Sequence, residues 1–242
     1  ITGRYYNQDG IYKIGKEGFN SYNLRSKISV KANNWLSFDN NTSIYSMDYI
    51  QPIFSKGQDS VGSQLWQIEM QGTPIIPVYT EDGKYTAGAA MSGYASFNDG
   101  NSNQEEKNLT VVTTLGLNIE PIKDVLKFRG DFTYKTIRRT LERYTAPVEY
   151  YTAPGADATT YIGQVDTYKR RYDYTTNYMS ANAVLTWTPK LNANHNLNVV
   201  AGWNLENYDY GRLGIHRTGL MYPGYTSLEL FDGTDITLME DG

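Results

Sequence analysis

The chain carries few side chains that could perform catalysis or hold a metal ion. None of its 242 residues is cysteine and only two are histidine, which excludes thiolate nucleophiles, cysteine-based metal sites and most histidine-based sites. The carboxylate pairs Asp232/Asp235 and Glu240/Asp241 occur in a loop-like stretch, where acidic side chains are usually solvated. That stretch also lacks the spaced acidic ligands of a calcium loop. We therefore expect no enzyme activity, no cofactor and no metal.

Tyrosine is the residue type whose chemistry best suits binding. The chain has 22 tyrosines against 7 phenylalanines and 4 tryptophans. An aromatic ring stacks on the C–H face of a sugar, and the tyrosine hydroxyl adds a hydrogen bond. Aromatic residues are also enriched in protein interfaces, so substrate contact, partner contact and packing between loops all remain open. The candidates in long connections are Trp66, Tyr79, Tyr85, Tyr94, Tyr150, Tyr151, Tyr161, Tyr222 and Tyr225.

Charge and hydropathy limit the function further. The formal net charge is −4 and no basic run could follow a phosphate backbone, so we expect no nucleic-acid partner. No apolar run approaches the roughly 18–20 residues of a transmembrane helix. A search for long apolar runs does not detect outer-membrane β-barrels, because apolar and polar side chains alternate along their strands and give each strand a weak hydropathy signal.

The stretch Ser21–Met47 predicts the hairpin around which the rest is organised. Its apolar positions are Tyr22, Leu24, Ile28 and Val30 in the first strand and Leu36, Phe38, Thr42 and Ile44 in the second. Successive side chains of a strand point to opposite faces, so one face is apolar and the other polar and, at Arg25 and Lys27, basic. Asn33-Asn34 predicts the turn, since asparagine tolerates a positive φ. Trp35 suits a membrane–water boundary.

The same unit occurs three times along the chain. It recurs near residues 109–135 and 174–206, and residues 1–7 add one more strand, which predicts seven strands in all. The predicted short connections lie near Asn33, Pro121 and Asn192. The longer connections are Gln8–Asn20, Asp48–Lys107 and Ile137–Asp173, and the segment after Tyr208, including His216, is expected to be loop-like.

Strict alternation of short and long connections distinguishes two all-β architectures. A soluble β-sandwich has no reason to place every long loop at one end, whereas outer-membrane barrels have short periplasmic turns and long extracellular loops. The polar face also carries more charge than a core would accept unpaired, whereas a water-filled or plugged lumen accepts it. We therefore expect part of a large antiparallel transmembrane barrel. Leu24, Ile28, Val30, Leu115, Leu117, Phe128, Phe132, Leu185, Val199 and Trp203 should face lipid, and Arg25, Lys27, Arg129, Asp131 and Asn182 should face the lumen.

Four stretches carry a resemblance to a known family. They are YYNQDGIYK (Tyr5–Lys13), YNLRSKISVKANNWLSFDNNTSIY (Tyr22–Tyr45), PVYTEDGKY (Pro77–Tyr85) and NVVAGWNLENYDYGR (Asn198–Arg212). In order and spacing they resemble the SusC/RagA family of TonB-dependent outer-membrane transporters. The second stretch is similar to the family's pattern of a basic strand, an Asn-Asp-Trp-like turn and an amphipathic return strand. The third is similar to a Pro–Tyr–Asp-Gly–Tyr loop common in the family.

The resemblance implies a plugged barrel of roughly 22 strands in the outer membrane of a Gram-negative bacterium. Residues 1–242 would form one segment of that barrel, about a third of it, because Ile1 opens in a strand-like run and Gly242 stops in a loop. The plug, the N-terminal domains and the TonB box would lie outside the segment. Arg25, Lys27, Arg129 and Asp131 would face the lumen and the plug, with the cations paired to plug carboxylates.

The resemblance also implies partners and cargo. A SusD-like surface lipoprotein would close over the extracellular mouth, and the TonB complex would energise uptake through regions outside this chain. The cargo would be an oligosaccharide or a peptide, and the apolar face would meet membrane lipid. Two alternatives remain open: a soluble β-rich carbohydrate-binding domain that uses its tyrosines as a sugar platform, and an all-β glycosidase.

Overall fold

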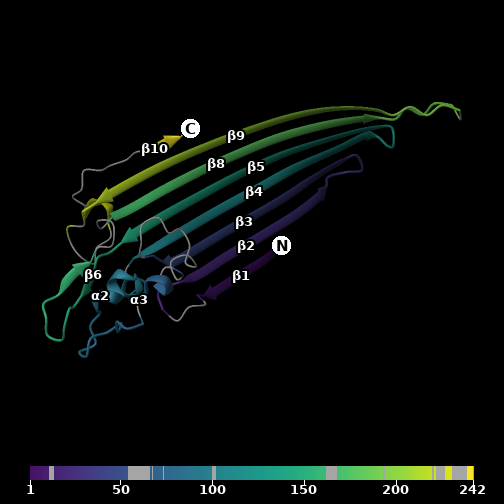
Figure 1. Cartoon of the computed structure of the whole chain (residues 1–242). Helices are drawn as coiled ribbons and strands as arrows, with labels where there is room; N and C mark the ends of the chain where they lie inside the picture. Colours follow the sequence, from purple (N-terminus) through teal and green to yellow (C-terminus); the bar gives the residue numbers. More distant parts are fainter. Residues whose placement is uncertain are drawn as a thin grey trace.

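A computed structural model describes most of the chain. The described residues are 1–10, 14–53, 66, 68–72, 74–99, 102–161, 168–192, 194–219, 221, 227–230 and 239–241, with the backbone alone at 160–161 and 239–241. The molecule is dominated by one open, antiparallel sheet of long strands, which Figure 1 shows with the short turns gathered at one end. The sheet is not closed into a barrel.

Seven long strands follow one another across this sheet in the order β1-β2-β3-β4-β5-β8-β9. Their bounds are Thr2–Asp9 (β1), Gly18–Lys31 (β2), Leu36–Pro52 (β3), Asn103–Ile122 (β4), Leu126–Thr145 (β5), Tyr168–Trp187 (β8) and Val199–Thr218 (β9). The three-residue strand β10 (Met239–Asp241) pairs with β9 at one edge. β6 (Val148–Tyr150) and β7 (Thr159–Tyr161) form a separate two-stranded sheet. The prediction of seven strands is confirmed for the long strands.

The pairing register divides the side chains between two faces. Residues that pair across neighbouring strands point to the same side, so each line of partners forms a row across the sheet. One row contains Val30, Phe38, Leu117, Gly130, Ala183 and Trp203. The adjacent row on the other face contains Ser29, Asp39, Gly116, Asp131, Asn182 and Asn204. We call these the apolar face and the polar face. The residues predicted to face lipid share the apolar face, and those predicted to face the lumen share the polar face.

The apolar face is apolar along only part of the strands. Its turn half runs from the row of Trp187 and Val199 to the row of Ile28 and Leu205, and large apolar side chains there are exposed, Trp203 by 57%. Its loop half starts at the row of Asn20, Asp48, Lys107, Thr140, Asp173 and Leu213. The same strands therefore carry two kinds of surface on one face.

The strands extend further toward the long connections than the sequence predicted. β4 begins at Asn103, β5 ends at Thr145, β8 begins at Tyr168 and β9 continues to Thr218. The predicted connections Asp48–Lys107 and Ile137–Asp173 are accordingly wrong and shrink to 53–102 and 146–167, and the segment after Tyr208 is strand as far as Thr218. In β4 and β8 both faces are polar or aromatic there, and in β5 and β9 only scattered aliphatic residues such as Leu141 and Ile215 occur. Backbone pairing therefore continues where the apolar–polar alternation has already ended.

Two turn predictions also need correction. Within the described residues the only non-glycine residue with a positive φ is Asp124, at 60° in the connection 123–125, so Asn33 and Asn34 do not use the left-handed region. Asn33 instead accepts a hydrogen bond on its side-chain oxygen from the Trp35 N–H at 3.0 Å. The connection 188–198 is longer than the connection 10–17, which breaks the strict alternation of short and long connections.

The buried apolar residues lie at the loop end of the sheet rather than under its middle. The connection 53–102 is not structureless, because it contains the short helices α2 (Ala87–Met91) and α3 (Tyr94–Asp99), beside the ends of the strands in Figure 1. The most buried apolar side chains are Ile53, Ala89, Ala90, Ala95, Phe97, Tyr144, Val148 and Tyr168. This arrangement places a small folded cap at the end where the long connections gather.

Candidate functional site

The cap forms because two connections far apart in sequence pack together. Thr86 begins α2, and its hydroxyl oxygen accepts a hydrogen bond from the Ala89 N–H at 3.3 Å. Ala89, Ala90 and Ala95 from the connection 53–102 then pack against Val148 from the connection 146–167. Alanine leaves little volume on the helices, so larger rings can approach them, and Tyr85, Tyr94 and Tyr150 pack around this core.

Five of the nine aromatic candidates meet in this cap. Tyr79 and Tyr85 stack with ring centroids 5.3 Å apart, and their backbones form an antiparallel bridge. The Tyr151 N–H donates to the Tyr85 carbonyl oxygen at 2.8 Å, which joins the two connections. Tyr94 and Tyr150 complete the group. We call Tyr79, Tyr85, Tyr94, Tyr150 and Tyr151 the tyrosine cluster.

The hydroxyl groups at the centre of the cluster are already used within the chain. The Tyr85 hydroxyl donates to Asp99 Oδ1 at 2.6 Å and accepts from Asn98 Nδ2 at 2.9 Å. Burial raises the pKa of Tyr85 above its ordinary value, and the hydrogen bond to Asp99 adds to the rise. Burial and the neighbouring Tyr79 likewise raise the pKa of Tyr94. Packing between the loops therefore accounts for Tyr85 and Tyr94, whereas the exposed ring of Tyr79 remains available for contacts.

The other aromatic candidates are not brought into the cluster by any described contact. Trp66 is 61% exposed. Tyr161 ends β7, where only the backbone is described, and Tyr222 and Tyr225 lie outside the described residues. The sequence therefore identified five residues that do gather, without indicating which rings touch.

The residues predicted to face the lumen share the polar face but do not form one network. Arg129 and Asp131 form an ion pair of 3.4 Å, and Arg25 Nε donates to Asn41 Oδ1 at 3.3 Å. Lys27 forms no ion pair with any described residue. Near the short turns a hollow of about 650 Å³ has Lys31, Asp39, Asn118, Lys127 and Arg129 among its lining residues. Glu120 also lines this hollow and pairs with Lys127 at 3.3 Å, so three cations and two carboxylates face it.

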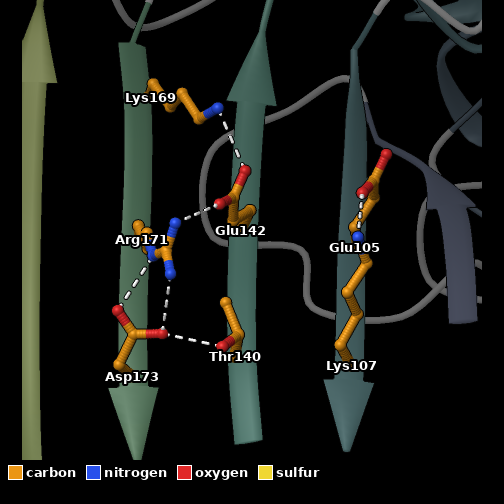
Figure 2. A network of polar contacts seen from close by, with 7 residues as sticks. All are labelled: Glu105, Lys107, Thr140, Glu142, Lys169, Arg171 and Asp173. Carbon is orange, nitrogen blue, oxygen red and sulfur yellow. Dashed lines mark hydrogen bonds and ion pairs between the residues drawn. The ribbon is translucent and has the colours of Figure 1, made fainter. Parts of the chain in front are cut away.

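The loop half of the apolar face carries an ion-pair network between β5 and β8, and Figure 2 shows it beside a separate Glu105–Lys107 pair on β4. Glu142 on β5 pairs with Lys169 at 3.0 Å and with Arg171 at 3.1 Å, both on β8. Arg171 also binds Asp173 at 2.8 Å, and the Thr140 hydroxyl donates to Asp173 at 2.7 Å. Side chains of this kind need water or one another, so this half of the face is suited to an aqueous surface.

Sequence analysis missed a group of arginines and tyrosines on the polar face. Arg139 on β5, Arg170, Tyr172 and Tyr174 on β8, and Arg212 on β9 form what we call the arginine–tyrosine array. The prediction assigned Tyr172 to a connection, and His216, which lies 5.3 Å from the Tyr168 ring, to a loop, but both residues are in strands. The period-two recurrence of Tyr168, Arg170, Tyr172 and Tyr174 was the available signal.

Other chemistry is sparse in the part of the chain that the structure describes. No group of three or more histidine, aspartate or glutamate side chains there could hold a metal ion. Asp232 and Asp235 lie outside the described residues, and Glu240 and Asp241 are described by backbone alone. His195 lies in the connection 188–198, where its ring nitrogen Nδ1 is 2.6 Å from Asn192 Oδ1. None of the described helices has the length and apolar character needed to cross a membrane.

Comparison with known proteins adds no family to these observations. Neither a search against models of protein families nor a search of curated proteins finds a match to this chain.

Proposed function

We propose that this chain is a segment of a large outer-membrane β-barrel that imports nutrients, of the SusC-like kind. The strands of the segment cross the membrane, and the apolar face meets lipid while the polar face lines a lumen that holds a plug. The tyrosine cluster and its connections lie on the extracellular rim. A SusD-like lipoprotein closes over that rim, and TonB energises uptake of an oligosaccharide or a peptide.

One observation carries the proposal: the apolar band on the sheet is staggered from hairpin to hairpin. Toward the loop end, the band reaches Tyr22 on β2 and Leu109 on β4, but only Met179 on β8 and Leu205 on β9. Toward the turn end, the boundary of the apolar band shifts along the strands in the same direction. The band ends near Val30 on β2, whereas in the later hairpins it continues for further rows.

Tilted strands explain this stagger. In a barrel the strands lean by about 35–45° from the membrane normal, so a row at right angles to the strands crosses the membrane obliquely. Both boundaries of a flat lipid layer must then move along the strands in the same direction from one strand to the next. A soluble sheet packed on a core has no need of two parallel, oblique boundaries.

The polar face and the open edges support the same proposal. A lumen plug with surplus carboxylates would complement Lys31 at the hollow near the short turns, where Lys127 and Arg129 already pair with Glu120 and Asp131. On the apolar face a second hollow of about 460 Å³, lined among others by Ile28, Phe38, Leu115 and Phe132, has the chemistry that an acyl chain would contact. Unpaired strand edges are not tolerated in lipid, so a larger barrel must supply further strands to this open sheet.

Paired cysteine variants of the full-length protein test the proposal. Lys27 and Ile28 are adjacent, both are exposed, and they lie on opposite faces of β2. In outer membranes a lipid-soluble maleimide should label Ile28→Cys and not Lys27→Cys, and the folded protein should need detergent and show heat-modifiable migration. Labelling of Lys27→Cys alone would mean that the faces are reversed. A folded protein that stays in solution without detergent would instead favour the soluble carbohydrate-binding domain, or the glycosidase if it also hydrolyses glycans.

A further inference from the structure

The arginine–tyrosine array is a compact surface on the loop-end part of the polar face. The guanidinium carbon of Arg212 lies 4.5 Å from the centre of the Tyr172 ring and 5.5 Å from that of Tyr174. Arg139 lies 5.3 Å from the Tyr174 ring, and Arg170 lies 6.0 Å from the Tyr172 ring. The two tyrosine rings are 6.2 Å apart. Cation–π attraction thus holds three arginines around two rings.

The backbone of β9 is adapted to this arrangement. Tyr172 pairs with Gly214, and a Cβ atom added at Gly214 would lie 2.7 Å from two carbons of the Tyr172 ring. Only the absence of a side chain at this position lets the ring lie across β9 beneath Arg212. The ring position therefore depends on residues from two strands, and any other residue at 214 would displace it.

The three arginines of the array differ in how fully their guanidinium groups are partnered. Arg139 forms a bidentate pair with Glu106, at 2.7 and 3.0 Å. Arg170 forms no ion pair with a described side chain, although one of its terminal nitrogens lies 3.4 Å from His216 Nδ1. Arg212 pairs in register with Asp241 of β10, whose side chain is not described. The Nε atoms of both arginines are buried without a hydrogen-bond partner among the described residues. A half-buried guanidinium without an anion carries a desolvation cost that the rings offset only in part. The array therefore attracts an anionic group.

The combination of groups indicates the chemistry of the ligand. A guanidinium fork binds a carboxylate with two parallel hydrogen bonds, and a tyrosine ring accepts the C–H face of a pyranose. An acidic sugar residue presents both features on one ring. Resting on the proposed barrel function, in which the polar face lines the import path, we propose that the array binds an acidic oligosaccharide through Arg170, Arg212 and the two tyrosine rings.

Titration of the detergent-purified full-length protein with tetragalacturonate tests the assignment, and its fully methyl-esterified form serves as the uncharged control. The acid should bind well above the ester, and the affinity for the acid should fall as salt rises. Arg170→Gln and Arg212→Gln should each weaken acid binding by about tenfold or more, since hydrogen bonds to charged groups contribute strongly. Arg138→Gln is the matched control, because Arg138 lies on the opposite face of the neighbouring strand.

A second variant separates the rings from the charges. Gly214→Ala should displace the Tyr172 ring and weaken both the acid and the ester, whereas the arginine variants should change the acid alone. Equal binding of acid and ester, arginine variants that bind like the wild type, or tetraglutamate binding as tight as tetragalacturonate would each overturn the assignment. If the lipid-soluble maleimide still labels Ile28→Cys and not Lys27→Cys, such a binding result contradicts the proposed role of the array and leaves the barrel proposal standing. If that labelling fails, the barrel proposal fails with it.

Discussion

The two halves of the apolar face share strands, register and direction, yet they have opposite chemistry. In the turn half, the row of Val30 ends at Trp203 and contains no charged side chain. In the loop half, Glu142, Arg171 and Asp173 form a connected ion-pair network. The backbone does not change between them, so the two halves differ in side-chain chemistry rather than in fold. A strand must therefore be interpreted along its length as well as by its faces.

The largest effect is expected from a deletion at the loop end of the strands. Deleting residues 149–164 and joining the ends with a short Gly-Ser linker removes the hairpin of β6 and β7, which packs beside α2. If the proposed function holds, we expect at least about a tenfold loss of lid capture and of uptake, because the proposed extracellular rim loses residues that pack against α2. Pull-down of the lipoprotein and nutrient uptake measure the loss.

The matched control is a deletion at the opposite end of the sheet. Shortening the connection 188–198 removes a similar kind of surface loop but leaves the cap intact. Partner capture should then stay at the wild-type level, and both deletions should retain heat-modifiable migration. Wild-type uptake and partner capture after the 149–164 deletion would refute the role of this rim.

Arginine substitutions, one in each half of the apolar face, test whether a charge costs more free energy in the turn half than in the loop half. Leu117→Arg places a charge in the turn half and should destabilise the full-length barrel by about 2–4 kcal/mol, as expected near the middle of a bilayer. Leu213→Arg places the same charge in the loop half, where a cost of about 0–1 kcal/mol is expected. Reversible denaturation in lipid vesicles measures both values. Equal costs at the two positions would remove the distinction between lipid and water along the strands.

The ion-pair network should contribute only modestly, because its members are partly exposed to water. Glu142→Gln removes the contacts to Lys169 and Arg171, and we expect a loss of about 1 kcal/mol or less. A double-mutant cycle with Arg171→Gln isolates the pair. A coupling energy well above about 1 kcal/mol would instead show that this half of the face is poorly hydrated.

The smallest effect concerns the ionisation of Tyr85. Its pKa is raised by burial and by Asp99, so folding of the cap favours the neutral phenol. The contribution of Tyr85 to cap stability is constant below the ordinary tyrosine pKa of about 10 and is lost as the pH rises from there through the raised pKa. The difference between the 295 nm absorbance titrations of the wild type and Tyr85→Phe should therefore have its midpoint above about pH 10. A midpoint at or below that value would contradict the partly buried, hydrogen-bonded position of Tyr85.

The sequence predicted the faces well where one face is apolar and the other polar. Alternation placed Leu24 and Arg25, or Phe132 and Asp131, on their observed sides, because a period of two follows directly from strand geometry. The prediction failed between Lys169 and Tyr174, since both faces of β8 carry polar or aromatic side chains there. Strand pairing depends on backbone hydrogen bonds, and these require no alternating pattern of side chains that could be recognised in the sequence of such a stretch.

The candidate site was predictable in location and not in detail. The two longest connections, 53–102 and 146–167, leave from the same end, so the gathering of Tyr79, Tyr85 and Tyr150 followed from topology. Which rings contact one another could not be predicted, because the stacking of Tyr79 on Tyr85 depends on a turn and on helices too short to show a periodic pattern. The array was missed because Gly214 matters only once its strand lies beside Tyr172.

The pairing of each long strand with its neighbours in sequence has a consequence for how such a sheet is assembled. β5 and β8 remain in continuous register from Leu126 opposite Trp187 to Thr145 opposite Tyr168, although β6 and β7 lie between them in the chain. A whole hairpin has thus been accommodated in a connection without shifting one pair of the sheet. Growth of the sheet can proceed one strand at a time, each new strand adding to the edge left by the last. The connections can accordingly lengthen, shorten or be exchanged in evolution while the strands keep their places.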